Sequence, residues 1–374
     1  MSELGLIVIW PKHLQHTDVI TSELERQFTI VEHYDIQWSA KILYQNFYRF
    51  YGDRLSTKSI KEKAIDSSEF RLIIFEDFNP KYAFRPTARG VEKVNANFFD
   101  LKKFFRKKFR TRFGIHGSND EAETNRDLSL LLGLNVEDYR SQYQDKCPVG
   151  VTKIHRNVTG IDGWDSLEKF FYFMNAIEPY ALLSNFDDFI PNLPSGNDID
   201  ILVLNRKKFA LFANAVKVSK GAERTNYQII VNDQRVDLDL RYVGDNYFDI
   251  HWQRDCMHTR QLHPKGFYVM SKENQNFLLL YHALIHKKEM PEKYRKFFKD
   301  PKDRLKVKLY EFMYHNSYQM VEPKDITLFF NKNNGGDIKF SRPRRLRKKK
   351  GVIGFLKKAL YRLNNLVHFR RGPD

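Results

Sequence analysis

Two hydrophobic patterns alternate over the first 140 residues. Strand-like apolar runs are "LGLIVIW", "TIVEHYDIQW" and "EFRLIIFED", and between them lie helical stretches around "VITSELERQF" and "SAKILYQNFYRFYGDRL". Further on, "SNDEAETNRDLSLLLG" predicts a capped helix that starts at Ser118 or Asn119, carries acids in its first turn and ends at Gly133. This β-α-β-α-β order predicts a small α/β sandwich over residues 1–140.

A second unit follows a segment that we interpret as a linker. Residues 141–164 contain Pro148, three glycines and few large apolar side chains. From 165 to 335 the patterns predict helix "SLEKFFYFMNAI", strands "YALLSNF" and "DIDILVLN", helix "RKKFALFANAV", strands "YQIIVN" and "QRVDLDLRYVG", and helix "KENQNFLLLYHALIHKK". The predicted fold class is therefore α/β (α+β) with two domains, the first ferredoxin-like, and residues 336–374 form a tail without a core pattern.

Paired aspartates mark two strands of the second unit. Asp198 and Asp200 lie two residues apart in "SGNDIDILVLN", and Asp237 and Asp239 repeat the spacing in "RVDLDLRYVG". Alternation places each pair on one face of its strand, where like charges repel unless a cation holds them. If the strands are neighbours, the acids form an oxygen-rich pocket that suits Mg²⁺ or Mn²⁺. The alternative is an acidic turn that faces water.

The stretches "PSGNDIDILV" and "VDLDL" resemble the acidic elements of the nucleotidyltransferase superfold of the DNA polymerase β type. The resemblance implies metal binding and catalysis by Asp198 and Asp200, and a third carboxylate at Asp239, with Asp237 as second choice. It places Ser195 and Gly196 in the loop beside the acids. The family's usual Gly-Gly or Gly-Ser is replaced by "LLSN", whose Ser184 and Asn185 become the expected phosphate contacts.

A narrower resemblance covers roughly residues 165–290. "LLSNFDDFIPNLPSGNDIDILV" with "DLRYVGDNYFDIHW" resembles nucleotidyltransferase-like proteins of bacterial surface-polysaccharide gene clusters and, more distantly, the fukutin-type phosphotransferases. This implies transfer of a phospho-substituent or nucleotidyl group from a nucleotide-activated donor, CDP-linked or a nucleoside triphosphate, to a glycan or lipid-linked acceptor. Two alternatives are a toxin-like nucleotidyltransferase acting on tRNA or protein, and a nucleotide-binding scaffold without catalysis.

Other polar residues of the second unit have two interpretations each. Arg241 is either a phosphate ligand or an ion-pair partner. His282 and His286, four residues apart, have the spacing of two metal ligands on one helix face, but without a third ligand we expect them to form a polar face.

The first unit contains a histidine in "FGIHGSNDEAETNRDL". This segment resembles the "HGSD" motif of nucleoside diphosphate kinase, with His116 at the nucleophile and Asp127 at its supporting acid. Trp10 and Phe113 depart from that family's lysine and asparagine. We therefore expect a kinase-like fold over about residues 4–133 in which His116 contacts a nucleotide or partner, rather than working phosphohistidine chemistry.

Cysteine content and charge distribution indicate where in the cell the protein is located. Two distant cysteines give no disulfide framework, and the N-terminus lacks a signal-peptide pattern, so we expect a cytoplasmic protein. The net charge is +17, with dense basic runs at 101–113 and 342–350. Residues 342–369 combine that second run with an apolar stripe at helical spacing, which predicts peripheral attachment to the anionic inner face of the membrane. Self-docking and an RNA-binding arm are the alternatives, with nucleic acid the less favoured partner.

Overall fold

The chain folds as a mixed α/β protein, as its patterns predict. The computed structural model describes residues 1–52, 68–88, 90–143, 150–184, 198–218, 226–295, 297–325 and 328–331. Two compact units are distinguished: Met1–Leu279 with Val321–Leu328, and Leu280–Met320 with the chain from Phe329 onward. Both large sheets belong to the first unit, so the predicted linker at 141–164 falls inside it.

The first sheet has five strands in the order β6-β1-β3-β2-β7. They are β1 (Glu3–Ile9), β2 (Thr29–Gln37), β3 (Glu69–Asp77), β6 (Ile115–Gly117) and β7 (Val151–His155). Neighbouring strands run antiparallel except β2 and β7, which run parallel. The strand β7 lies in the predicted linker segment; its mostly exposed side chains gave no apolar alternation to detect.

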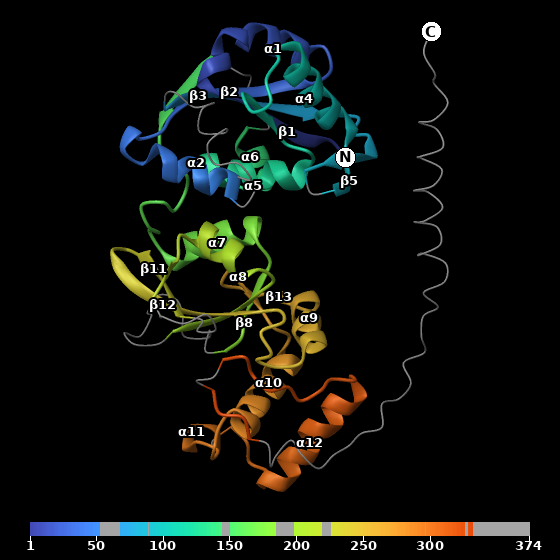
Figure 1. Ribbon diagram of the computed structural model, residues 1–374, viewed down its shortest axis with the longest axis vertical. Helices are drawn as coiled ribbons and strands as arrows, with labels where there is room; N and C mark the ends of the chain where they lie inside the picture. Colours follow the sequence, from blue (N-terminus) through green and yellow to red (C-terminus); the bar gives the residue numbers. More distant parts are fainter. Residues whose placement is uncertain are drawn as a thin grey trace. The chain divides into compact units, whose positions relative to one another are not determined.

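Helices cover both faces of this sheet (Figure 1). The helices α1 (Thr17–Glu25) and α4 (Ala96–Lys108) pack on one face, where Ile20 and Phe105 join one apolar cluster. On the other face lie α2 (Leu43–Tyr51), α5 (Glu121–Leu132) and α6 (Val136–Tyr143). Short 3₁₀ turns, η1 (Pro11–His16) and η2 (Ala40–Ile42), precede α1 and α2, and the strands β4 (Tyr82–Thr87) and β5 (Gly90–Asn95) form a separate hairpin.

The start of α5 differs from the prediction by one or two residues. The N-cap is Asp120, whose Oδ1 accepts a hydrogen bond from the Glu123 backbone N–H at 2.8 Å, and not Ser118 or Asn119. A carboxylate is as good a cap as a hydroxyl or amide, so the sequence "SND" offers three successive candidates. Gly133 ends the helix in the left-handed conformation, with φ of 75°, as predicted.

The second sheet has seven strands in the order β10-β11-β12-β9-β8-β14-β13. They are β8 (Tyr180–Leu182), β9 (Ile199–Val203), β10 (Val216–Lys217), β11 (Asn226–Val231), β12 (Gln234–Tyr242), β13 (Gln261–Leu262) and β14 (Tyr268–Val269). The central pair β9 and β12 is parallel, and β8 runs antiparallel to β9. The fully buried Ile201 and Leu240 explain why these short apolar runs form interior strands.

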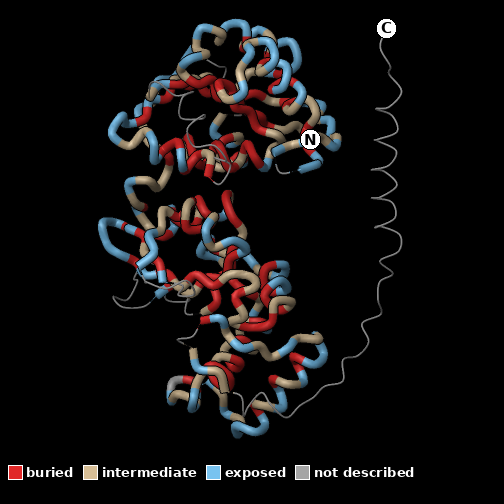
Figure 2. The backbone as a smooth tube through the Cα atoms, viewed as in Figure 1, coloured by how far each residue is buried: buried red, intermediate tan, exposed pale blue. Residues whose placement is uncertain are grey.

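Two helices of the second sheet share a core with the first. They are α7 (Leu167–Ile177) and α8 (Arg206–Ala213). The Tyr172 hydroxyl on α7 accepts from the Asn135 backbone N–H at 3.1 Å, and one apolar cluster includes Leu131 of α5 together with Phe170 of α7. Figure 2 shows buried positions along the strands of both sheets and on these helices.

Of the remaining helices, one lies between β12 and β13 in the chain and the others follow β14. They are α9 (Ile250–His258), α10 (Lys272–Ile285), α11 (Glu292–Arg295) and α12 (Lys302–His315). After α12, the segment Val321–Leu328 returns to the first unit, where the Lys324 Nζ donates to the Gly244 carbonyl at 2.7 Å. We call Val321–Leu328 the return segment.

Candidate functional site

Three aspartates from two neighbouring strands converge at the second sheet. Asp200 on β9 lies directly opposite Asp239 on β12 in the parallel register, and Asp198 immediately precedes β9. One carboxylate oxygen of each lies within 4.8 Å of those of the other two. The shared register explains the convergence, because opposite residues of adjacent strands point to the same face and Asp198 is two residues before Asp200. These are the three acids that the sequence favoured.

The closeness of the three acids affects the ionisation of Asp200. Burial, then the charges of Asp239 and Asp198, raise the pKa of Asp200 to about 7, against the opposing effects of the Ser184 hydroxyl and of Arg241. Around neutral pH, Asp200 therefore either keeps its proton or requires further positive charge nearby.

Ser184 fixes the orientation of Asp200. Its hydroxyl donates to Asp200 Oδ2 at 2.8 Å, from the loop that follows β8. The sequence predicted Ser184 as a phosphate contact, and in the structure its described partner is the carboxylate instead. The other predicted loop residues, Asn185, Ser195 and Gly196, lie outside the described residues.

Arg241 is an ion-pair partner in this structure, as one of its two interpretations expects, and its predicted contact with a phosphate stays a prediction. It follows Asp239 by two positions on β12, so both side chains lie on one face, and its Nη2 donates to Asp239 Oδ2 at 2.9 Å. Its Nη1 donates to Asp325 Oδ2 at 3.2 Å, and the guanidinium lies 4.4 Å from the centre of the Tyr247 ring. Arg241 and Asp325 are both buried. The guanidinium is thus divided between two carboxylates.

Asp325 is a residue that the sequence did not single out. It comes from the return segment, 84 residues beyond Arg241, and no local pattern marks it. By contrast, the predicted alternative ligand Asp237 is exposed, accepts a hydrogen bond from Gln228 Nε2 at 2.7 Å, and is not part of the cluster of three.

The donor set fits a hard divalent cation. Three carboxylates offer oxygen ligands, and Mg²⁺ and Mn²⁺ bind such ligands while keeping positions for water and substrate phosphate. Burial first, and then the charges of Asp239 and Asp198, raise the pKa of Asp200, so a bound cation would favour its ionised form. Asp198 is exposed, so a substrate from solvent has access to one side of the cluster.

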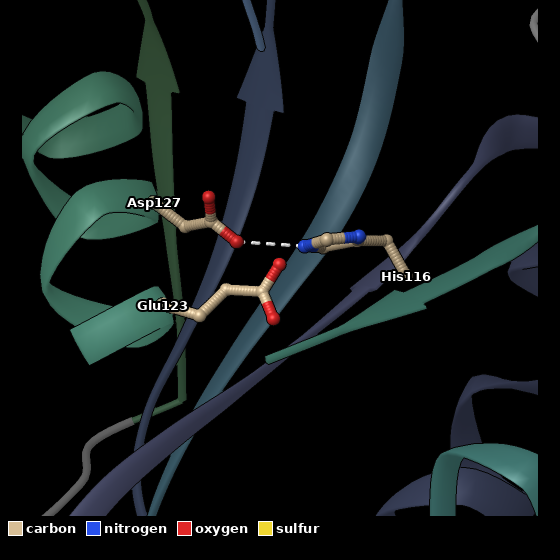
Figure 3. Close-up of side chains that lie close together, drawn as sticks. All are labelled: His116, Glu123 and Asp127. Atoms are coloured by element: carbon tan, nitrogen blue, oxygen red, sulfur yellow. Dashed lines mark hydrogen bonds and ion pairs between the residues drawn. The ribbon is translucent and has the colours of Figure 1, made fainter. Parts of the chain in front are cut away.

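A second polar cluster surrounds His116 in the first unit (Figure 3). His116 Nε2 lies 2.7 Å from Asp127 Oδ2, and Glu123 offers a further carboxylate nearby. All three are buried, and Arg126 already pairs with both acids, through Nη2 to Glu123 at 3.4 Å and through Nε to Asp127 at 2.7 Å. The guanidinium therefore supplies the positive charge that a cation would bring.

The environment of His116 favours a neutral imidazole. Burial lowers its pKa most strongly, while the charge of Asp127 acts in the opposite direction. The ring also makes edge contacts with Phe50 and Tyr51, at centroid distances of 5.1 and 5.7 Å. The predicted support of His116 by Asp127 is thus present as a contact, with aromatic rings beside the imidazole.

Comparison with known proteins assigns no family to this chain. No protein-family model matches it, and a search of curated proteins gives no significant match. The functional argument therefore depends on the geometry of the clusters described above.

Proposed function

We propose that the protein is a metal-dependent transferase with a nucleotidyltransferase fold in its second sheet. The observation that carries this proposal is the convergence of Asp198, Asp200 and Asp239 from two parallel, in-register strands. The surrounding order supports it: β8 precedes the first two acids and pairs with β9, and the third acid lies on the next strand over. The first sheet has the strand order β6-β1-β3-β2, which supports a ferredoxin-like, kinase-like first domain.

Each residue of the cluster has a role in this proposal. Asp198, Asp200 and Asp239 hold Mg²⁺ or Mn²⁺, which when bound neutralises charge on the phosphates of the donor. Ser184 keeps the Asp200 carboxylate in place, and Arg241 does the same for Asp239. Asp239 also orients the acceptor hydroxyl and takes its proton. The substrates that we propose are a nucleotide-activated donor, CDP-linked or a nucleoside triphosphate, and a glycan or lipid-linked acceptor at the inner membrane face.

The test is a panel of nucleoside triphosphates and CDP-alcohols with Mg²⁺ or Mn²⁺, scored by thermal shift and by turnover. We expect cation-dependent stabilisation and turnover by the wild type with at least one donor, and loss of both in Asp200→Ala. The control is Asp303→Asn, whose side chain is 97% exposed on α12 and distant in sequence from the cluster. Cation-dependent stabilisation that survives Asp200→Ala unchanged would contradict the proposal, and donor binding without turnover would favour a scaffold.

A further inference from the structure

The outward face of α4 carries an unusual combination of side chains. The helix buries Phe98, Leu101 and Phe105 against the first sheet, which leaves the opposite face in solvent. No acidic residue occurs anywhere between positions 101 and 119. We call the exposed side chains on this face and just beyond the helix the α4 basic surface: Lys103, Phe104, Lys107, Lys108, Arg110 and Arg112.

Among the described residues, no salt bridge joins a cation of this surface to a carboxylate, although the charge of Lys103 acts on Asp100 and helps to lower its pKa. The Lys108 ammonium lies 5.4 and 5.9 Å from the centres of the Phe104 and Phe109 rings. Asp100, the last acid before this surface in the sequence, is bound to Arg85 through two hydrogen bonds, of 3.0 and 2.7 Å.

The helix α12 provides the contrast. It is also rich in lysine and arginine, but three of its four such residues pair with acids. Lys308 and Arg304 pair with Asp300 at 2.6 and 3.7 Å, and Lys306 pairs with Asp303 at 3.9 Å. A solvated basic helix in this protein therefore has compensating carboxylates, whereas the α4 basic surface does not.

This concentration of like charges lowers the stability of the folded protein, and contacts among the described residues do not account for it. Lys103 and Lys107 are four residues apart, a spacing at which like charges repel on a helix. The helix dipole favours Lys107 and Lys108 in the last turn. It does not account for Lys103, a turn earlier, or for Arg110 and Arg112, beyond the helix end. Phe104 is 43% exposed among these cations, and a merely solvated face gains nothing from an exposed aromatic ring.

We propose that the α4 basic surface binds an anionic lipid bilayer. The five cations contact lipid phosphates, and Phe104 enters the boundary between headgroups and acyl chains. The neighbouring rings are less exposed than Phe104: Phe109 is stacked on His16 at a centroid distance of 4.1 Å, and the Arg112 guanidinium lies 5.2 Å from the centre of the Phe113 ring. One accessible ring suits a bilayer better than a single-stranded nucleic acid, which stacks successive bases on several rings. None of the described helices is long and apolar enough to span a bilayer.

The first experiment measures partitioning of the full chain onto vesicles of phosphatidylglycerol and phosphatidylcholine by co-sedimentation. In the variant K103Q/K107Q/R110Q we expect binding to fall at least tenfold, and in the wild type we expect binding to weaken as salt increases. The matched control is R304Q/K306Q/K308Q on α12, which removes the same number of charges. Equal loss in both triple variants would mean that only net charge matters and would overturn the assignment.

The second experiment detects contact directly, so it is independent of any other lipid-binding segment. All four native tryptophans are buried, with at most 5% exposure, so a new exposed tryptophan has a distinct signal. We expect brominated phosphatidylglycerol to quench Phe104→Trp by at least twofold more than Val307→Trp, a control whose native side chain is 53% exposed on α12.

Two outcomes of these experiments overturn the proposal. One is equal quenching of the two tryptophan variants. The other is that single-stranded RNA both displaces the protein from vesicles and shifts the emission of Phe104→Trp. These two results together would assign the surface to nucleic acid. Neither outcome depends on the metal cluster, so this proposal stands or fails separately from the proposed transferase function.

Discussion

At the scale of single residues, Asp200 has the most informative environment of the second sheet. Burial raises its pKa most strongly, two neighbouring carboxylates raise it further, and one hydroxyl and one guanidinium oppose these effects. Its pKa is about 7 in the folded protein and 3.8 in the unfolded chain, so the folded state keeps the proton to higher pH. Stability without cation is therefore lost progressively as pH rises from about 4 to about 7.

We accordingly predict that Asp200→Asn stabilises the cation-free protein at pH 8 by about 2 kcal/mol and has little effect at pH 4. At pH 8 the substitution removes a repelled charge, whereas at pH 4 both side chains are neutral. Chemical unfolding of wild type and variant at the two pH values measures this. The same variant should lose the stabilisation by Mn²⁺ that the wild type gains, and a variant less stable than wild type at pH 8 would refute the argument.

Asp127 allows a test of the second cluster at the same scale. It is fully buried and pairs with both His116 and Arg126. We predict that Asp127→Asn lowers the free energy of unfolding by about 3 kcal/mol, because it leaves the buried Arg126 short of a counter-charge. It should also lower the pKa of His116 further, since the Asp127 charge now raises it. Urea unfolding and histidine NMR titration measure the two effects.

The control is Asp100→Asn, which breaks a pair of the same chemistry whose side chains are 33% and 53% exposed. We expect that substitution to cost less than about 1 kcal/mol, because solvent screens an exposed ion pair. Equal costs at the two sites would mean that the Asp127 cluster is not as isolated from water as its burial indicates.

At the scale of elements, β12 connects the metal cluster to the return segment. Asp239 faces the cluster, and Arg241 on the same side of the strand holds Asp239 with one nitrogen and Asp325 with another. Because the guanidinium is divided, Asp239 is only partly neutralised and keeps capacity for a cation. The return segment therefore influences the cluster although it does not touch the proposed cation.

We predict that Asp325→Asn weakens Mn²⁺ binding about tenfold, a loss of affinity typical for residues that orient a metal ligand without binding the metal themselves. Without Asp325, the full charge of Arg241 acts on Asp239 and competes with the cation. Mn²⁺ titration by calorimetry measures the affinity, Asp325→Glu should restore part of it, and Asp303→Asn should leave it unchanged. If Asp325→Asn binds Mn²⁺ as tightly as the wild type, Asp325 does not act on the cluster through Arg241. The proposed metal site would still hold in that case, provided that Asp200→Asn no longer binds Mn²⁺.

At the scale of the whole molecule, the described contacts of the metal cluster end within the first compact unit. That unit comprises Met1–Leu279 and the return segment, and the chain beyond Asn331 supplies none of the cluster residues described above. The predicted membrane attachment through 342–369 lies outside the described residues. The two properties are therefore separable by truncation.

We predict that a chain ending at Asn331 keeps the thermal stabilisation by Mn²⁺ and loses part of its binding to anionic vesicles. The remainder of that binding should disappear when K103Q/K107Q/R110Q is added to the truncated chain. Thermal shift and co-sedimentation measure the two properties in parallel. Undiminished vesicle binding after truncation would refute the role predicted for residues 342–369.

The sequence by itself determined the elements with strong local patterns. The strand β3 coincides with the run "EFRLIIFED", and Gly133 ends α5 where the pattern placed it. The pairing of Asp198 with Asp200 was also predicted, because alternation along a strand is a local property. The choice of Asp239 over Asp237 followed from the resemblance to the nucleotidyltransferase superfold, since alternation places both residues on the same face.

Only the tertiary structure decided which distant groups meet. Strand β7 joins the sheet through backbone hydrogen bonds, which depend little on its mostly exposed side chains. Likewise, Arg241 became an ion-pair partner because Asp325 returns to it from 84 residues away. Chain reversals of this length are fixed by packing of the intervening helices, and no periodicity of neighbouring residues records them.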